Sequence, residues 1–135
     1  MDNNKIAEFL NDRDRFARLN GIQITATSDN FAVAEMTVEE RHLNGGDVCQ
    51  GGAIFTLADL ANAMVMNASG QLTVGINNNI SFVSSARLGD HLTANATLVA
   101  DHKKMPMCEV RVYNQDKRLI AVMTGQGYRK AASVG

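Results

Sequence analysis

The chain has 135 residues, of which 45% are hydrophobic and 20% are charged, and it carries a formal net charge of −1. These values predict one globular domain over residues 1–135 with a sizeable core, and they exclude an intrinsically disordered chain. The balanced charge, with no basic run longer than two residues, also excludes the electrostatic footprint of a nucleic-acid partner.

The first predicted element is an amphipathic helix over residues 4–19. Its apolar side chains fall on roughly one helical face: Ile6, Phe9, Leu10, Phe16 and Leu19. The dipeptide Asn20-Gly21 follows directly and is a typical helix stop.

From residue 22 onward the apolar pattern changes to a period of two, which is typical of strands. Short strands are predicted over 22–27 and 31–38. The second strand places four apolar residues on one face: Ala32, Ala34, Met36 and Val38. Residues 39–48 are polar and rich in glycine, so we expect a loop there.

A second helix is predicted over residues 51–68, because this stretch is almost entirely apolar and ends at Ser69-Gly70. Strand-like stretches joined by turn-like segments follow at 73–83, 91–100, 106–114 and 118–128. Because no helix separates these strands, antiparallel pairing is favoured over parallel crossovers.

The apolar helix determines the architecture that we expect. A helix that is apolar nearly all round must be covered nearly all round. One antiparallel sheet of five to six strands can cover it by curling about it, and the remaining side calls for a second subunit. The sequence therefore predicts an α+β fold in which a curled sheet wraps around one long central helix, with a short N-terminal helix, in a dimer.

One polar stripe interrupts this helix. Thr56, Asp59 and Asn62 follow one another at intervals of three, and Asp59 is the only ionisable side chain between residues 51 and 68. An ionised carboxylate buried without partners destabilises a protein by several kcal/mol. We therefore expect Asp59 to be held by a structural hydrogen bond or ion pair, or to be functional.

Two glycines, Gly51 and Gly52, stand where this helix begins. Free N–H groups of a first helical turn can polarise a carbonyl oxygen, and glycine lets a substrate approach them closely; close packing alone is the alternative. Gly51 and Asp59 lie about 12 Å apart along one helix axis. Two antiparallel helices related by a two-fold axis would bring Gly51 of one chain to Asp59 of the other.

The stretch HLNGGDVCQGGAIFTLAD resembles the signature of the hotdog-fold acyl-CoA thioesterases, particularly the phenylacetate-degradation (PaaI-like) branch. In that signature an Asn stands seven positions before the first Gly of a His-Gly-Gly triplet, and an Asp or Glu follows eight positions later. Asn44, Gly51 and Asp59 keep both spacings. The later VGINNNISFVSSARLGD resembles the strand and turn of the family, and the resemblance covers roughly residues 15–130.

The resemblance implies hydrolysis of an aryl- or medium-chain acyl-CoA in a homodimer with shared sites, commonly paired into a homotetramer, and without a metal or redox cofactor. The Gly51 N–H would then polarise the thioester carbonyl, with Gly52 beside it. Asp59 of the partner would act as general base or as nucleophile, and Asn44 would orient the carbonyl or the water.

This chain departs from the family pattern at two positions. Gln50 replaces the His of the His-Gly-Gly triplet as a candidate catalytic residue. Its amide can donate a hydrogen bond and so suffices if the family His positions the substrate, but it cannot carry a proton, so activity should fall if that His titrates. Some relatives place a hydroxyl residue on the strand after the helix, where this chain has Gly75. Asn77 or Asn79 is a possible substitute for that hydroxyl.

Four basic residues are candidates for the phosphates of coenzyme A, although a solvated surface charge is the more usual role of each: Arg87, Lys103, Lys104 and Arg129. His42 lies in the polar loop, where a solvated or turn-stabilising role is more usual than a catalytic one. Cys49 and Cys108 have no metal-ligand or CxxC spacing, so we interpret them as reduced thiols that pack in the protein.

The N-terminus lacks the apolar core of a signal peptide, and no apolar run has the length of a membrane span. Together with the reduced thiols, these features predict a cytoplasmic protein without a membrane partner. Two other functions remain open. Gln50 and Gly75 are also compatible with a hotdog module that binds acyl-CoA without hydrolysing it. A hotdog dehydratase acting on acyl-carrier-protein substrates is the weaker alternative, because those enzymes use a His that this helix lacks.

Overall fold

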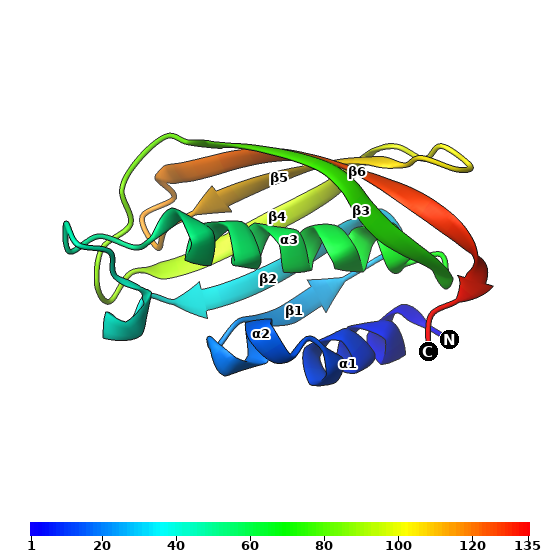
Figure 1. Cartoon of the computed structure of the whole chain (residues 1–135), viewed down its shortest axis with the longest axis horizontal. Helices are drawn as coiled ribbons and strands as arrows, with labels where there is room; N and C mark the ends of the chain where they lie inside the picture. The colour runs from blue at the N-terminus through cyan, green and yellow to red at the C-terminus, as the bar shows by residue number, and fades with distance from the viewer.

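The computed structural model describes the whole chain, residues 1–135. The N-terminal part contains α1 (Asn3–Arg13), α2 (Arg15–Leu19), β1 (Gln23–Thr27), β2 (Phe31–Thr37) and the 3₁₀ turn η1 (Glu40–His42). The central helix α3 (Gly51–Asn67) follows, and then β3 (Gln71–Phe82), β4 (His91–Ala100), β5 (Met107–Tyr113) and β6 (Leu119–Ser133). Figure 1 shows these elements along the chain.

The predicted N-terminal helix over 4–19 is broken into two helices at Asp14. The backbone N–H of Asp14 donates to the carbonyl of Leu10 at 2.8 Å and ends α1. Its side-chain Oδ1 accepts from the backbone N–H of Ala17 at 3.0 Å and begins α2. A carboxylate that caps a new helix competes with continuation of the old one, which explains the break.

The six strands form one antiparallel sheet in the order β1-β2-β4-β5-β6-β3. Figure 1 shows α3 lying across one face of this curled sheet, and α3 contacts every strand. The prediction of a sheet curled around one central helix is therefore confirmed. The apolar residues that alternate along β2 (Ala32, Ala34 and Met36) are all fully buried, as the period-two pattern predicted.

A bulge in β3 changes which of its side chains point towards α3. Gly75 pairs with Gly127 and Asn77 pairs with Gln126, so Ile76 is one residue more than β6 can match. Beyond the bulge, Asn78 and Ile80 are half-buried, whereas their neighbours in the strand are exposed. The strand thus presents Asn78 to the helix.

The two edges of the sheet differ in how they are covered. At β1, the side chain of Asn11 in α1 bonds both backbone groups of Ile24, with distances of 2.7 and 3.0 Å. At the other edge, the outer side of β3 has no partner strand in this chain, and Val74, Ile76 and Phe82 are exposed along it. A long edge strand with exposed apolar side chains is a ready surface for pairing with another chain.

Helices long and apolar enough to cross a membrane do not occur in this fold.

Candidate active site

The first turn of α3 is capped by Gln50. Its side-chain Oε1 accepts from the backbone N–H of Gly52 at 2.6 Å, and its own carbonyl accepts from the N–H groups of Ala53 and Ile54. Gln50 is therefore the N-cap of the helix, a position more often taken by Ser, Thr, Asn or Asp. This explains why the residue stands directly before the two glycines.

These bonds leave the Gly51 N–H as the amide of the first turn that donates no hydrogen bond within the chain. It stands at the positive end of the dipole of a 17-residue helix. The ring of Phe82, at the end of β3, lies over Gly51, and a Cβ atom added there would be 2.9 Å from Cζ of Phe82. Glycine at this position lets the Phe82 ring pack directly against the helix start.

Asp59 lies two turns further along α3 and is half-buried. Its Oδ1 accepts a hydrogen bond from Nδ2 of Asn78 at 3.3 Å. Burial raises the pKa of the Asp59 carboxyl above its usual range, and the negative charge of Asp14 adds to the rise, whereas hydrogen bonds from Asn62 and Asn78 oppose it. A carboxylate with a raised pKa is a stronger base than an exposed one.

Within one chain the free amide and the carboxylate are too far apart to act on one atom. Gly51 and Asp59 are eight residues apart on the same helix, so they are separated by about 12 Å along its axis. The two groups therefore do not meet within a single subunit.

Asn44 holds the loop before α3 in shape. Its Oδ1 accepts from the backbone N–H groups of Gly46 at 2.8 Å and Val48 at 3.3 Å, and no bond joins it to Gly51 or Asp59. Arg87 reaches the same end of the molecule, because the backbone N–H of Cys49 donates to the carbonyl of Ala86 at 2.8 Å. The Arg87 side chain is exposed.

The other basic candidates lie at the opposite end of α3. Lys103 and Lys104 are exposed in the β4–β5 connection, which is bound to β6 by a hydrogen bond from the Arg129 N–H to the Lys104 carbonyl. Arg129 is only 8% exposed, and its guanidinium contacts Asp101 at 2.8 Å and the carbonyl of His102 at 2.9 Å. The idea of Arg129 as a phosphate ligand is wrong, because its charge is already paired.

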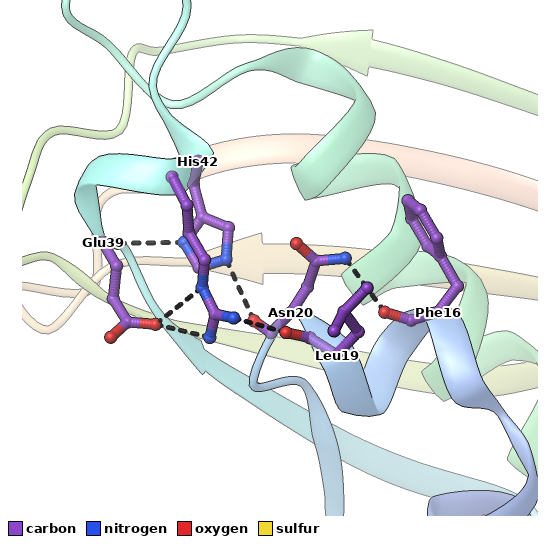
Figure 2. A network of polar contacts seen from close by, with 6 residues as sticks. Phe16, Leu19, Asn20, Glu39 and His42 are labelled. Carbon is purple, nitrogen blue, oxygen red and sulfur yellow. Dashed lines mark hydrogen bonds and ion pairs between the residues drawn. The ribbon is translucent and has the colours of Figure 1, made fainter.

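A cavity of about 310 Å³ opens beside the start of α3. Its lining residues are Phe16, Asn20, Ile22, Arg41, His42, Leu43, Gln50, Gly52, Ala53 and Thr56. Figure 2 shows polar contacts that hold two of these lining residues together: His42 bonds the N–H of Glu39 and the carbonyl of Asn20, each at 2.9 Å. Of the polar stripe on α3, only Thr56 lines this cavity.

Comparisons with known proteins show the family of this chain. Residues 46–121 match the model of the thioesterase superfamily. The chain belongs to the thioesterase superfamily. It is 32% identical to the acyl-coenzyme A thioesterase PaaI of Escherichia coli, over 95% of this chain and 91% of that protein. It is also 34% identical to a putative esterase of Archaeoglobus fulgidus, over 93% of this chain and 81% of that protein.

Solved structures place this thioesterase in the hotdog fold. The structure of Escherichia coli PaaI, 31% identical, superposes with a TM-score of 0.95 and covers 98% of this chain and 96% of that one. A Streptococcus mutans protein bound to acetyl-CoA, 25% identical, superposes with a TM-score of 0.80 over 84% of this chain and 91% of that one. The resemblance to PaaI-like thioesterases and the predicted fold are confirmed.

His42 and Cys49 have structural roles in this thioesterase. His42 is buried, not solvated, because its ring closes the η1 turn: Nδ1 accepts from a backbone N–H and Nε2 donates to a carbonyl. Burial raises the pKa of the Cys49 thiol to about 11, and Cys49 and Cys108 are both free and buried. Groups of three His, Cys, Asp or Glu side chains that could hold a metal ion are absent.

The polar neighbour of Asp59 is a residue that the sequence analysis did not select. Asn77 and Asn79 are exposed and line a small pocket on the opposite face of β3, whereas Asn78 bonds Asp59. Three consecutive asparagines are unusual in a strand, because Asn is depleted there. Only the bulge at Ile76 determines which of the three faces the carboxylate.

Proposed function

We propose that this thioesterase hydrolyses acyl-CoA thioesters with aryl or medium-chain acyl groups, in a homodimer whose two sites each combine Gly51 of one subunit with Asp59 of the other. The observation that carries this proposal is the pairing, on one helix, of a free N–H at the positive end and a half-buried carboxylate. The name of the Escherichia coli relative supports the acyl-CoA substrate.

The exposed edge of β3 supports the dimer. If β3 pairs antiparallel with β3 of a second copy, the two sheets join and the two α3 helices lie side by side in opposite directions. The 12-residue length of β3 and its exposed Val74 and Ile76 suit such pairing. A two-fold axis then carries the first turn of each helix towards the middle of the other, and a homotetramer would need a second contact elsewhere.

In this dimer the reaction follows from the two groups. The thioester oxygen accepts the Gly51 N–H, which stabilises the negative charge that develops when water attacks the carbonyl carbon. Asp59 of the partner takes a proton from that water, so the attacking oxygen becomes nucleophilic as the bond to carbon forms. Collapse of the tetrahedral intermediate breaks the carbon–sulfur bond, and the departing thiolate receives the proton from Asp59.

The remaining assignments concern substrate binding. Gly52, beside the free amide, admits the capping Gln50 side chain, because a Cβ atom there would be 2.5 Å from Gln50 Oε1, and Asn44 shapes the preceding loop. Among the basic residues predicted from the sequence, Arg87 is the best placed for a phosphate of coenzyme A, because it lies at the Gly51 end of the helix. Lys103 and Lys104 would belong to the far end, beyond Gly75 and Asn77.

Thiol release from a panel of acyl-CoA substrates tests this function. The wild-type protein is expected to release free coenzyme A from at least one aryl- or medium-chain substrate. The acid limb in the pH profile of kcat/KM should lie above the usual range of an aspartate, because the pKa of Asp59 is raised. Absence of thiol release on every substrate, in a protein that binds acyl-CoA tightly, would favour the non-catalytic binding module.

The capping role of Gln50 bears on that second function. Because Gln50 is engaged with the Gly52 N–H at 2.6 Å, the missing His of the family is replaced here by a structural cap. A cap of this kind leaves the Gly51 N–H free and removes no group that the proposed reaction needs. The substitution is therefore compatible with an active enzyme.

Replacing Gln50 with alanine is expected to lower the free energy of unfolding by about 1 kcal/mol, because the Gly52 N–H loses its acceptor. The value of kcat should change by less than about tenfold, since the Gly51 N–H and Asp59 stay in place. Chemical denaturation and steady-state kinetics measure both effects. Gln50→Glu is the matched control, because it keeps a capping oxygen and should keep the stability. A loss of kcat in Gln50→Ala comparable to that in Asp59 variants would show that Gln50 is catalytic.

A further inference from the structure

Two carboxamide side chains adjoin the Asp59 carboxylate. Asn62 follows it by one turn on α3 and is 2% exposed, and Asn78 reaches it from β3. Asn78 donates from Nδ2 to Oδ1 of Asp59 at 3.3 Å. Asp59 therefore accepts a hydrogen bond from the neighbouring strand, and the Asn62 amide on its own helix also lowers its pKa.

The oxygens of both amides are left without a donor. Oδ1 of Asn62 and Oδ1 of Asn78 are buried and accept no hydrogen bond. Both lie against Gly125 in β6, where an added Cβ atom would be 2.7 and 2.8 Å from them. Buried acceptors without donors destabilise the folded state, so stability does not explain this pair of amides. Their orientation is explained if both NH₂ groups are needed at the carboxylate.

The bulge in β3 explains how Asn78 comes to serve Asp59. A side chain at Gly75 would face the same region, and the one atom within 4 Å of its Cβ position is Nδ2 of Asn78, at 3.7 Å. The amide of Asn78 therefore stands beside the space that a side chain at position 75 would occupy. Gly75 and Asn78 are complementary, because the lack of a side chain at Gly75 leaves space that the amide donor of Asn78 adjoins.

We propose that Asn78 is a positioning residue of the hydrolytic reaction: it orients the Asp59 carboxylate in place of a hydroxyl at position 75. Asn62 is the second donor, and Gly125 is the residue that leaves space for both amides. The inference rests on the proposed function, because it assigns a role relative to Asp59 as the base.

The chemical consequence is a fixed carboxylate. A donor on Oδ1 holds that oxygen and turns the other towards the attacking water, and it also favours the ionised form that can accept a proton. The opposing influences on the same carboxylate are its burial and the charge of Asp14, the cap of α2. Helix α3 carries no other ionisable side chain between residues 51 and 67. Removing the Asn78 donor therefore shifts the balance towards the protonated acid.

The variant Asn78→Ala is expected to lower kcat by about tenfold or more while KM changes little, because the base is misplaced and the substrate contacts are not. The acid limb of the pH profile should move to higher pH, since the pKa of Asp59 rises when a hydrogen bond that lowers it is lost. The Tm should not fall, because an unpaired buried oxygen is removed with the amide. Ser81→Ala, at an exposed position of the same strand, is the control and should behave as wild type.

Rescue and crowding provide the second part of the test. In the Asn78→Ala background, Gly75→Ser is expected to recover part of the lost kcat, because its hydroxyl can reach the vacated amide position. Gly125→Ala should reproduce the loss by displacing both amides, whereas Gly45→Ala, which has open space around it, should not.

An unchanged kcat and pH profile in Asn78→Ala, with Asp59→Asn inactive, would overturn the role of Asn78 and leave the proposed function standing. A fall in Tm with no shift of the acid limb would also overturn it, since that pattern describes a structural residue. Activity retained in Asp59→Asn would instead overturn the proposed function itself.

Discussion

Replacing Asp59 with asparagine is expected to lower kcat by about 10²–10⁴-fold, because the amide cannot accept the proton of the attacking water. The substitution keeps the shape of the side chain and leaves the Gly51 N–H untouched, so KM should change much less than kcat. Steady-state thiol release on the best substrate of the panel measures the effect. Asp116→Asn, an exposed carboxylate in the β5–β6 turn, is the control and should keep full activity.

The same variant separates catalysis from folding. The pKa of Asp59 is raised in the folded protein above its usual value of 3.8, so the stability linked to its protonated form is complete below that value and is lost as pH rises through the folded pKa. Asp59→Asn is therefore expected to raise Tm at pH 7, and the gain should vanish under acid conditions. An inactive protein that is more stable at neutral pH would identify Asp59 as functional; lower stability at pH 7 would contradict this account.

Replacing Gly51 with proline is expected to lower kcat by about 10²–10³-fold, because proline removes the single N–H proposed to stabilise the oxyanion. The backbone accepts the change: Gly51 is the first residue of α3, where proline is well tolerated, and Gln50 before it has φ −65° and ψ 136°, an extended conformation compatible with a following proline. Circular dichroism should therefore show an intact helix content.

Gly51→Ala is the matched control for this experiment. Alanine keeps the N–H but adds the same Cβ atom close to the ring of Phe82, which is half-exposed and free to shift. Kinetics of the two variants thus separate the loss of the donor from crowding at the helix start. If alanine and proline lower kcat equally, the amide of Gly51 has no role and the space over it is what matters.

Much of the fold could be predicted because buried segments are recognisable in the sequence by their apolar residues. The stretch over 51–68 is so apolar that only a helix covered on most sides can hold it, and α3 spans Gly51–Asn67. Strand β4 has the predicted bounds, and the other strands differ by a few residues at their ends. Helix breaks are harder to predict: Asp14 fits the pattern of one amphipathic helix, yet it caps a second one.

Single side chains in the site were less predictable, because their direction depends on register and on distant partners. Asn77, Asn78 and Asn79 are equivalent in composition, and one extra residue in β3 selects Asn78. Arg129 has a side chain of the type that binds phosphate, but Asp101, 28 residues away in sequence, already pairs with it. Local sequence patterns indicate which residue types contribute to the site. Tertiary contacts determine which of several residues of the same type lies in it.

The shared site is the central claim, and subunit complementation tests it most directly. Asp59→Asn and Gly51→Pro chains carrying different affinity tags are co-expressed, and the heterodimer is purified through both tags. Each homodimer is expected to be nearly inactive. The heterodimer should recover about half of the wild-type kcat, because one of its two sites combines an intact Gly51 with an intact Asp59 from the other chain. A heterodimer no more active than the two parent homodimers would contradict the shared site.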